Sequence, residues 1–81
     1  GSKVIGGSDP WRTLFTSSAY RSLTGHTFNQ GKDVVLAMNA DADANDCDIY
    51  GTTYRSSSGN IGVKTSKTGS ARFNYLVLCP A

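Results

Sequence analysis

A single apolar run near the carboxyl end constrains the fold more than any other stretch of the chain. Residues 71–79 read ARFNYLVLC, a run rich in β-branched and aromatic side chains and too short for a buried helix. We therefore expect a central β-strand here. One set of alternate side chains should face the core: Phe73, Tyr75 and Val77. The opposite face becomes apolar at Leu76 and Leu78, which a domain with few layers cannot easily cover. We predict that these two leucines contact a neighbouring subunit.

The composition supports a β-rich domain. Of the 81 residues, 18 are Ser or Thr and nine are Gly, whereas Glu is absent and only 17% are charged. Such a chain forms one domain with many turns, and at this size it is marginally stable unless it is cross-linked or assembled. The net charge is only +2, and the basic residues are spread singly, so we expect no nucleic-acid partner. No stretch has the length needed to insert into a membrane.

The amino-terminal half contains short runs separated by turn residues. Residues 3–6 form either a first strand or a linker, and a strand is predicted over 11–16. We interpret Ser17-Ser18 as a break, residues 19–23 as a further strand, and residues 24–32 as a loop. The opening Gly1-Ser2 looks like a cloning scar, which leaves residues 3–81 as a single domain.

The carboxyl-terminal half predicts four strands joined by short connections. The first covers 33–39, with both faces buried, and the second covers 47–55. The third covers 60–66 and pairs with 71–79 through a turn in which Gly69 takes a positive φ. The result is an antiparallel meander. With the amino-terminal strands, the fold class is all-β: a small antiparallel β-sandwich of six to seven strands.

The two cysteines leave two interpretations open. Cys47 and Cys79 both lie in strand-like runs. A bridge between them would close a loop of about 30 residues and stabilise a small secreted domain. Alternatively, two buried free thiols would act as small apolar side chains.

The order of features from residue 33 to residue 79 resembles a known family. The strings GNIGVKT at 59–65 and FNYLVL at 73–78 are similar to those of H-type lectin-like β-sandwich domains and of carboxyl-terminal domains of bacteriophage tail fibres. The first thirty residues carry no such resemblance, and the ending Cys79-Pro80-Ala81 departs from the small residue that closes these domains. The resemblance implies a homotrimer whose loops contact sugars or a host receptor, excised here from a longer fibre protein.

Aromatic side chains beside hydrogen-bonding groups are the strongest candidates for a ligand surface. Flat rings stack on the apolar face of a pyranose, while arginine donates hydrogen bonds to hydroxyl groups. Trp11, Tyr50, Tyr54 and Arg55 fit this description, and alternation places Tyr50 and Tyr54 on the same face of their strand. Packing within the sheet or between subunits is the competing interpretation of these rings.

The acidic segment is the main candidate metal site, and an axial site made by His26 from three copies of a trimer is a second one. Asp41, Asp43 and Asn45 have the alternate oxygen spacing that opens a calcium loop. Asp46 replaces the required glycine and Thr52 the bidentate Glu, so an EF-hand is excluded. A looser Ca²⁺ site and a plain polar loop both remain open, and no other cofactor is indicated.

Catalysis has little support in the sequence. His26 is the only histidine, no nucleophile elbow is present, and without Glu the usual carboxylate pair is missing. We expect a non-enzymatic protein, located in a virion tail fibre or outside the cell, that binds a cell-surface glycan or receptor. The alternatives are a trimerisation or capping domain without a ligand, and a small secreted effector cross-linked through its cysteines.

Overall fold

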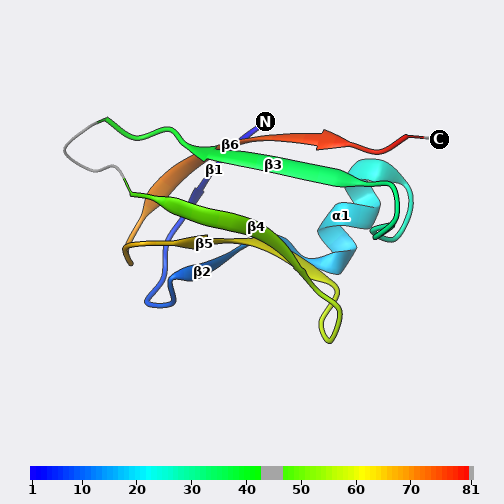
Figure 1. The fold of residues 1–81 in the computed structure, drawn as a ribbon, viewed down its shortest axis with the longest axis horizontal. Coiled ribbons are helices and arrows are strands. Elements are labelled where there is room, and N and C mark those ends of the chain that lie inside the picture. Colours follow the sequence, from blue (N-terminus) through cyan, green and yellow to red (C-terminus); the bar gives the residue numbers. More distant parts are fainter. Residues whose placement is uncertain (43–46, 81) are drawn as a thin grey trace.

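The computed structural model describes residues 1–42 and 47–80. Within these residues the chain forms one helix and six strands (Figure 1). Their bounds are β1 (Ser2–Ile5), β2 (Trp11–Phe15), α1 (Ser17–Thr24), β3 (Val34–Asn39), β4 (Ile49–Arg55), β5 (Asn60–Thr65) and β6 (Ala71–Leu78).

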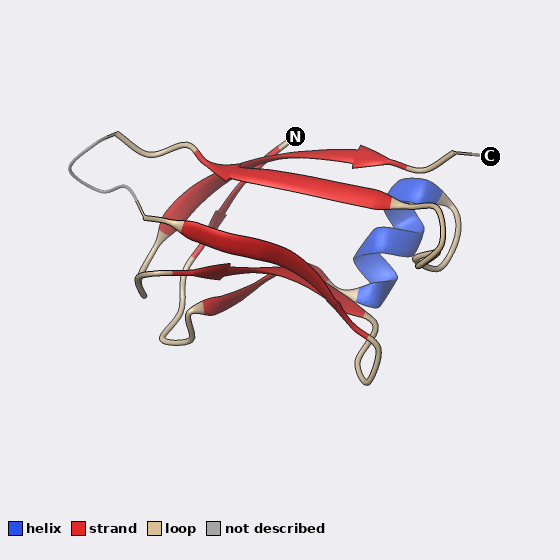
Figure 2. Ribbon diagram, in the orientation of Figure 1, coloured by secondary structure: helices blue, strands red, loops and turns tan. Residues whose placement is uncertain are grey.

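The strands form two three-stranded antiparallel sheets that lie face to face (Figure 2). Sheet A has the order β1-β6-β3, and sheet B has the order β2-β5-β4. The expected all-β antiparallel sandwich with six strands is therefore confirmed. The closing strand β6 is central in its sheet, as predicted, and β1 is a strand rather than a linker. Gly1 extends the pairing of β1 with β6, because its backbone exchanges two 2.8 Å hydrogen bonds with Tyr75.

The predicted meander is wrong beyond its β4–β5 hairpin. Strand β6 pairs with β1 and β3 instead of β5, so the chain changes sheets between β5 and β6 (Figure 1). The carbonyl groups of Lys67 and Gly69 accept hydrogen bonds from the Arg12 guanidinium instead of closing a hairpin ladder. Gly69 has φ +92°, which confirms the turn conformation although not the pairing.

Side chains from both sheets fill the space between them. The buried apolar residues are Leu14, Phe15, Tyr20, Val35, Ile61, Val63, Ala71 and Phe73. Along β6 the predicted alternation is confirmed, with Phe73 fully buried and Leu76 and Leu78 facing outward. For β3, the expectation that both faces are buried is wrong, since only its inward side chains are covered. No described segment covers the outer face of sheet A.

Residues 19–23 belong to helix α1, not to a strand. Thr16 caps the helix by accepting a hydrogen bond from the Ala19 amide at 3.2 Å. Gly25 ends it in the left-handed region, at φ +84°. The buried ring of Tyr20 makes edge contacts with Phe15 and Phe28. The helix thus closes one end of the sandwich (Figure 1).

A buried arginine links the two sheets at the other end. Arg12 is 2% exposed, although it lies on a strand that faces the core. Its guanidinium donates to the Ile5 carbonyl at 2.9 Å, to the Lys67 carbonyl at 2.6 Å and to the Gly69 carbonyl, and its Nε donates to the Thr65 hydroxyl at 3.1 Å. These bonds join the end of β1 in sheet A to β2, to β5 and to the following turn. In this way backbone carbonyls compensate a buried charge.

Neither interpretation of the cysteines is met in full, since no bridge joins them and they are not both buried. Cys47 is half-buried and Cys79 is exposed, and both are free thiols. The bridge on which the cross-linked effector alternative depends does not form in this structure. Among the described residues, no helix is both long and apolar enough to cross a membrane.

Candidate functional site

The outer face of sheet B carries a stack of an indole and a guanidinium. Trp11 begins β2 and lies flat across Gly62 of the neighbouring strand β5. A Cβ atom placed on Gly62 would come within 2.5 Å of the indole, so only glycine leaves room for it. The indole Nε1 donates to the Thr53 hydroxyl on β4 at 2.7 Å. The Arg55 guanidinium lies 3.7 Å from the ring centroid, on the other face of the indole.

This Trp11–Arg55 stack presents a cation rather than a bare aromatic platform. One face of the indole is occupied by the backbone of Gly62, and the other by Arg55. Stacking holds the planar guanidinium in one orientation and leaves its edges free. Among the described residues, the Arg55 side chain makes no hydrogen bond. Its N–H groups are therefore available to an external acceptor.

A polar hollow adjoins the stack. It has a volume of about 460 Å³ and extends from Trp11 and Arg55 along the turn between β1 and β2. Asp9 in this turn accepts a hydrogen bond from the Trp11 amide at 2.9 Å and so fixes where β2 begins. The hollow combines backbone groups, hydroxyl side chains at Ser8 and Thr13, the Asp9 carboxylate and the Arg55 guanidinium. This is a surface suited to a polar ligand.

The structure separates the two tyrosines that the alternation had placed together. A β-bulge at Tyr50 pairs Ile49 with Thr65 and Gly51 with Lys64, so the alternation along β4 reverses. Tyr54 therefore points inward and stacks on Phe28, with the ring centroids 4.6 Å apart. Tyr50 is 67% exposed on the bulge and does not line the hollow beside the stack. Of the four predicted ligand residues, only Trp11 and Arg55 come together.

No protein-family model matches the chain, and no curated protein or solved structure matches it either. A functional assignment consequently depends on the geometry and the chemistry of the chain's own surfaces.

The predicted metal site is only partly visible. Asp43 and Asn45 lie outside the described residues. The Oδ2 atom of Asp41 accepts hydrogen bonds from the Arg72 amide and from the Asn39 side-chain amide, both at 2.9 Å. These two bonds, the Arg72 amide first, hold the pKa of the Asp41 carboxyl below its usual value. Within residues 1–42 and 47–80, no group of three or more His, Cys, Asp or Glu residues could hold a metal.

A buried carboxylate near α1 was not expected from local sequence patterns. The Oδ2 atom of Asp33 accepts from the Tyr20 hydroxyl at 2.7 Å, from the Asn29 amide at 3.0 Å, and lies 2.8 Å from His26 Nε2. Burial alone would raise the pKa of Asp33, but these hydrogen bonds outweigh it and the pKa is lowered. Burial and the bond to Asp33 raise the pKa of Tyr20.

We interpret this Asp33 cluster as structural. It attaches the loop after α1 to the helix and to the start of β3. No serine hydroxyl among the described residues bonds to the His26 ring, so the geometry offers no described nucleophile beside it. Tyr20, Asn29 and Asp33 are separated along the chain, and no short motif connects them.

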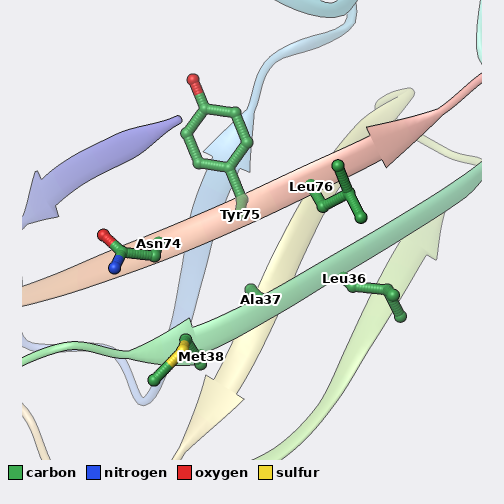
Figure 3. A pocket seen from close by; sticks show the side chains of 6 residues that line it. All are labelled: Leu36, Ala37, Met38, Asn74, Tyr75 and Leu76. Atoms are coloured by element: carbon green, nitrogen blue, oxygen red, sulfur yellow. The ribbon is translucent and has the colours of Figure 1, made fainter.

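The predicted interface residues lie on an apolar surface of sheet A. Leu76 is 54% exposed and Leu78 is 47% exposed, both on the outer side of β6. Figure 3 shows Leu36 and Leu76 extending from the neighbouring strands β3 and β6. Both side chains line an open hollow of about 370 Å³. We call the exposed apolar side chains of this sheet the apolar face: Val4, Val34, Leu36, Met38, Leu76 and Leu78.

Proposed function

We propose that the chain is a non-enzymatic carbohydrate-binding module that assembles through sheet A and contacts its ligand through sheet B. The Trp11–Arg55 stack beside its polar hollow carries the ligand half of this proposal. An oriented guanidinium with free N–H groups, next to hydroxyl side chains, is suited to hydroxyl and carboxylate oxygens of a saccharide.

The apolar face supports the second part of the proposal, self-association. We expect this face to pack against further copies of this chain. Exposed apolar surface of this extent, on the order of 500 Å², lies in the upper range for the largest patch on a monomer. Its six side chains are each roughly half exposed. Opposing two such faces would remove on the order of 1,000 Å² from water, which at about 25 cal/mol per Å² sets an upper limit of about 25 kcal/mol for the gain. The cost of association, about 4–15 kcal/mol or more, and the ordering of side chains oppose this gain, so assembly should depend on concentration.

The biological setting that fits both halves is the tip of a trimeric fibre. The resemblance of residues 33–79 to H-type lectin-like and phage tail-fibre domains supports this setting, with a cell-surface glycan as the target and the virion or the extracellular space as the location. A capping domain that only trimerises a fibre is the second candidate, because the apolar face alone would suffice for it.

Binding to a glycan array separates the two candidates. We expect the wild-type protein to bind a subset of the glycans and the Arg55→Ala variant to lose that binding. Arg21→Ala is the matched control, because Arg21 is an exposed arginine on α1, outside the proposed site. Absence of binding by the assembled wild-type protein would favour the capping domain.

Light scattering tests the assembly. The Leu76→Asp variant should shift the protein towards monomer, because it places a charge in the apolar face. Tyr50→Asp serves as the control, since Tyr50 is equally accessible but lies on sheet B. A wild-type protein that stays monomeric at high concentration would contradict the role of the apolar face.

A further inference from the structure

We propose that the ligand of sheet B is an acidic saccharide, whose carboxylate or sulfate groups are bound by Arg55 and Lys64. This inference depends on the proposed function and specifies its ligand class. It begins with the register of the sheet, which fixes the side chains that share the outer face.

The register places a second cation next to the Trp11–Arg55 stack. Trp11 lies directly opposite Lys64 on β5, so both side chains point outward. The indole extends from that position over Gly62 towards Thr53, and Arg55 covers it. The register thus brings Lys64 to the position directly opposite the residue that Arg55 covers. Lys64 is exposed, and its ammonium group has no partner among the described residues.

The remaining outward positions carry hydroxyl and amide groups and no carboxylate. Thr13 and Thr53 both lie opposite Gly62, and Asn60 lies opposite Arg55. The acidic residues closest in sequence lie beyond the ends of these strands, and one of them, Asp9, lines the hollow beside the stack. Asp9 precedes β2 and is hydrogen-bonded to the Trp11 amide, and Asp48 precedes β4.

The charge pattern therefore selects an anion. Two cations without acidic partners repel a cationic ligand. A neutral ligand would remove water from them without supplying an opposite charge, which costs free energy. A guanidinium held flat on an indole can bind a carboxylate or a sulfate through two parallel hydrogen bonds, with little further loss of side-chain freedom. The threonine and asparagine side chains can bind sugar hydroxyl groups beside it.

The experiment uses one array that carries neutral oligosaccharides together with uronate-, sialate- and sulfate-bearing ones. We expect preferential binding to acidic glycans, weakened by rising ionic strength. The double variant Arg55→Gln/Lys64→Gln should bind these glycans about 10- to 100-fold more weakly, as expected for lost charge-assisted hydrogen bonds. The control Arg21→Gln/Lys32→Gln removes the same charge from exposed positions outside sheet B and should bind like wild type.

The outcomes separate this inference from the proposed function. Binding restricted to neutral glycans would overturn the acidic ligand and leave the carbohydrate-binding function intact. Absence of binding to any glycan would overturn both. An equal loss in the two double variants would show that net charge, rather than sheet B, controls binding, and would also overturn the inference. Far-ultraviolet circular dichroism of each variant confirms that the comparison is made between folded proteins.

Discussion

Replacing Gly62 by alanine should destabilise the fold by displacing Trp11. The new Cβ would lie 2.5 Å from the indole and 2.5 Å from the Arg12 carbonyl oxygen, a backbone atom of the paired strand β2. Such overpacking costs about 1–3 kcal/mol. Lifting the indole would also break its bond to Thr53, at about 0.5–1.5 kcal/mol, and its contact with Arg55, at about 0.5–1 kcal/mol. Alanine also reduces the conformational freedom of the unfolded chain, which offsets about 0.4–1 kcal/mol of this loss.

These contributions give a net loss of about 1–5 kcal/mol, and the central value of about 3 kcal/mol corresponds to a fall in Tm of about 12–24 °C for a domain of this size. Urea unfolding measures the free energy, and the fluorescence of Trp11, the only tryptophan of the chain, reports its displacement. Gly51→Ala is the matched control, because Gly51 lies in the same sheet with no atom near its Cβ position. If Gly62→Ala were as stable as Gly51→Ala, with unchanged fluorescence, the close packing of Trp11 on Gly62 would be refuted.

Three further substitutions test the interactions that hold the ends of the sandwich. Arg12→Met should cost about 1–3 kcal/mol in urea unfolding, because it leaves partly buried carbonyl groups without donors; an unchanged free energy of unfolding would contradict the role of this arginine. The pKa of Asp33 is lower in the folded chain than its ordinary value of 3.8. The ionised Asp33 therefore stabilises the fold above pH 3.8, and this stabilisation is lost as the pH falls through the lowered pKa of the folded chain. Stability should consequently fall less steeply with acid in Asp33→Asn than in wild type, as measured by acid unfolding. Thr16→Ala should cost about 1 kcal/mol and reduce helical circular dichroism, whereas Ser18→Ala in the first turn should change little.

Local alternation predicts the faces of the closing strand correctly. In β6, Phe73 is inward and Leu76 outward because the period of two continues without interruption along the strand. In β4 the same rule fails at Tyr50, where a bulge reverses the alternation. A bulge arises from the pairing with β5, and a single strand read alone does not show it.

Pairing between distant segments is the other feature that local patterns do not predict. Strand β3 pairs with β6, so Leu36 lies opposite Leu76 although most of the second half of the chain separates them in sequence. Short connections favoured a meander, but Arg12 binds the segment between β5 and β6 through contacts that no local motif indicates. Helix α1 did have local signals, a cap at Thr16 and a glycine at position 25. Eight residues are too few for helical periodicity to outweigh a strand interpretation.

The two outer faces of the sandwich suggest that assembly and binding reinforce each other. Sheet A is apolar and sheet B is polar and cationic on opposite sides of one thin domain, so copies joined through sheet A would present several copies of sheet B outward. Linked sites of this kind gain avidity, commonly 10²–10⁴-fold, without any new contact. On a densely immobilised glycan, Leu76→Asp should therefore bind about 100-fold more weakly than wild type, while its affinity for a soluble monovalent fragment stays unchanged. Arg55→Gln should lower both values. If Leu76→Asp weakened monovalent binding as strongly as Arg55→Gln does, the two faces would not be separate in function, and the division between assembly and ligand binding would be wrong.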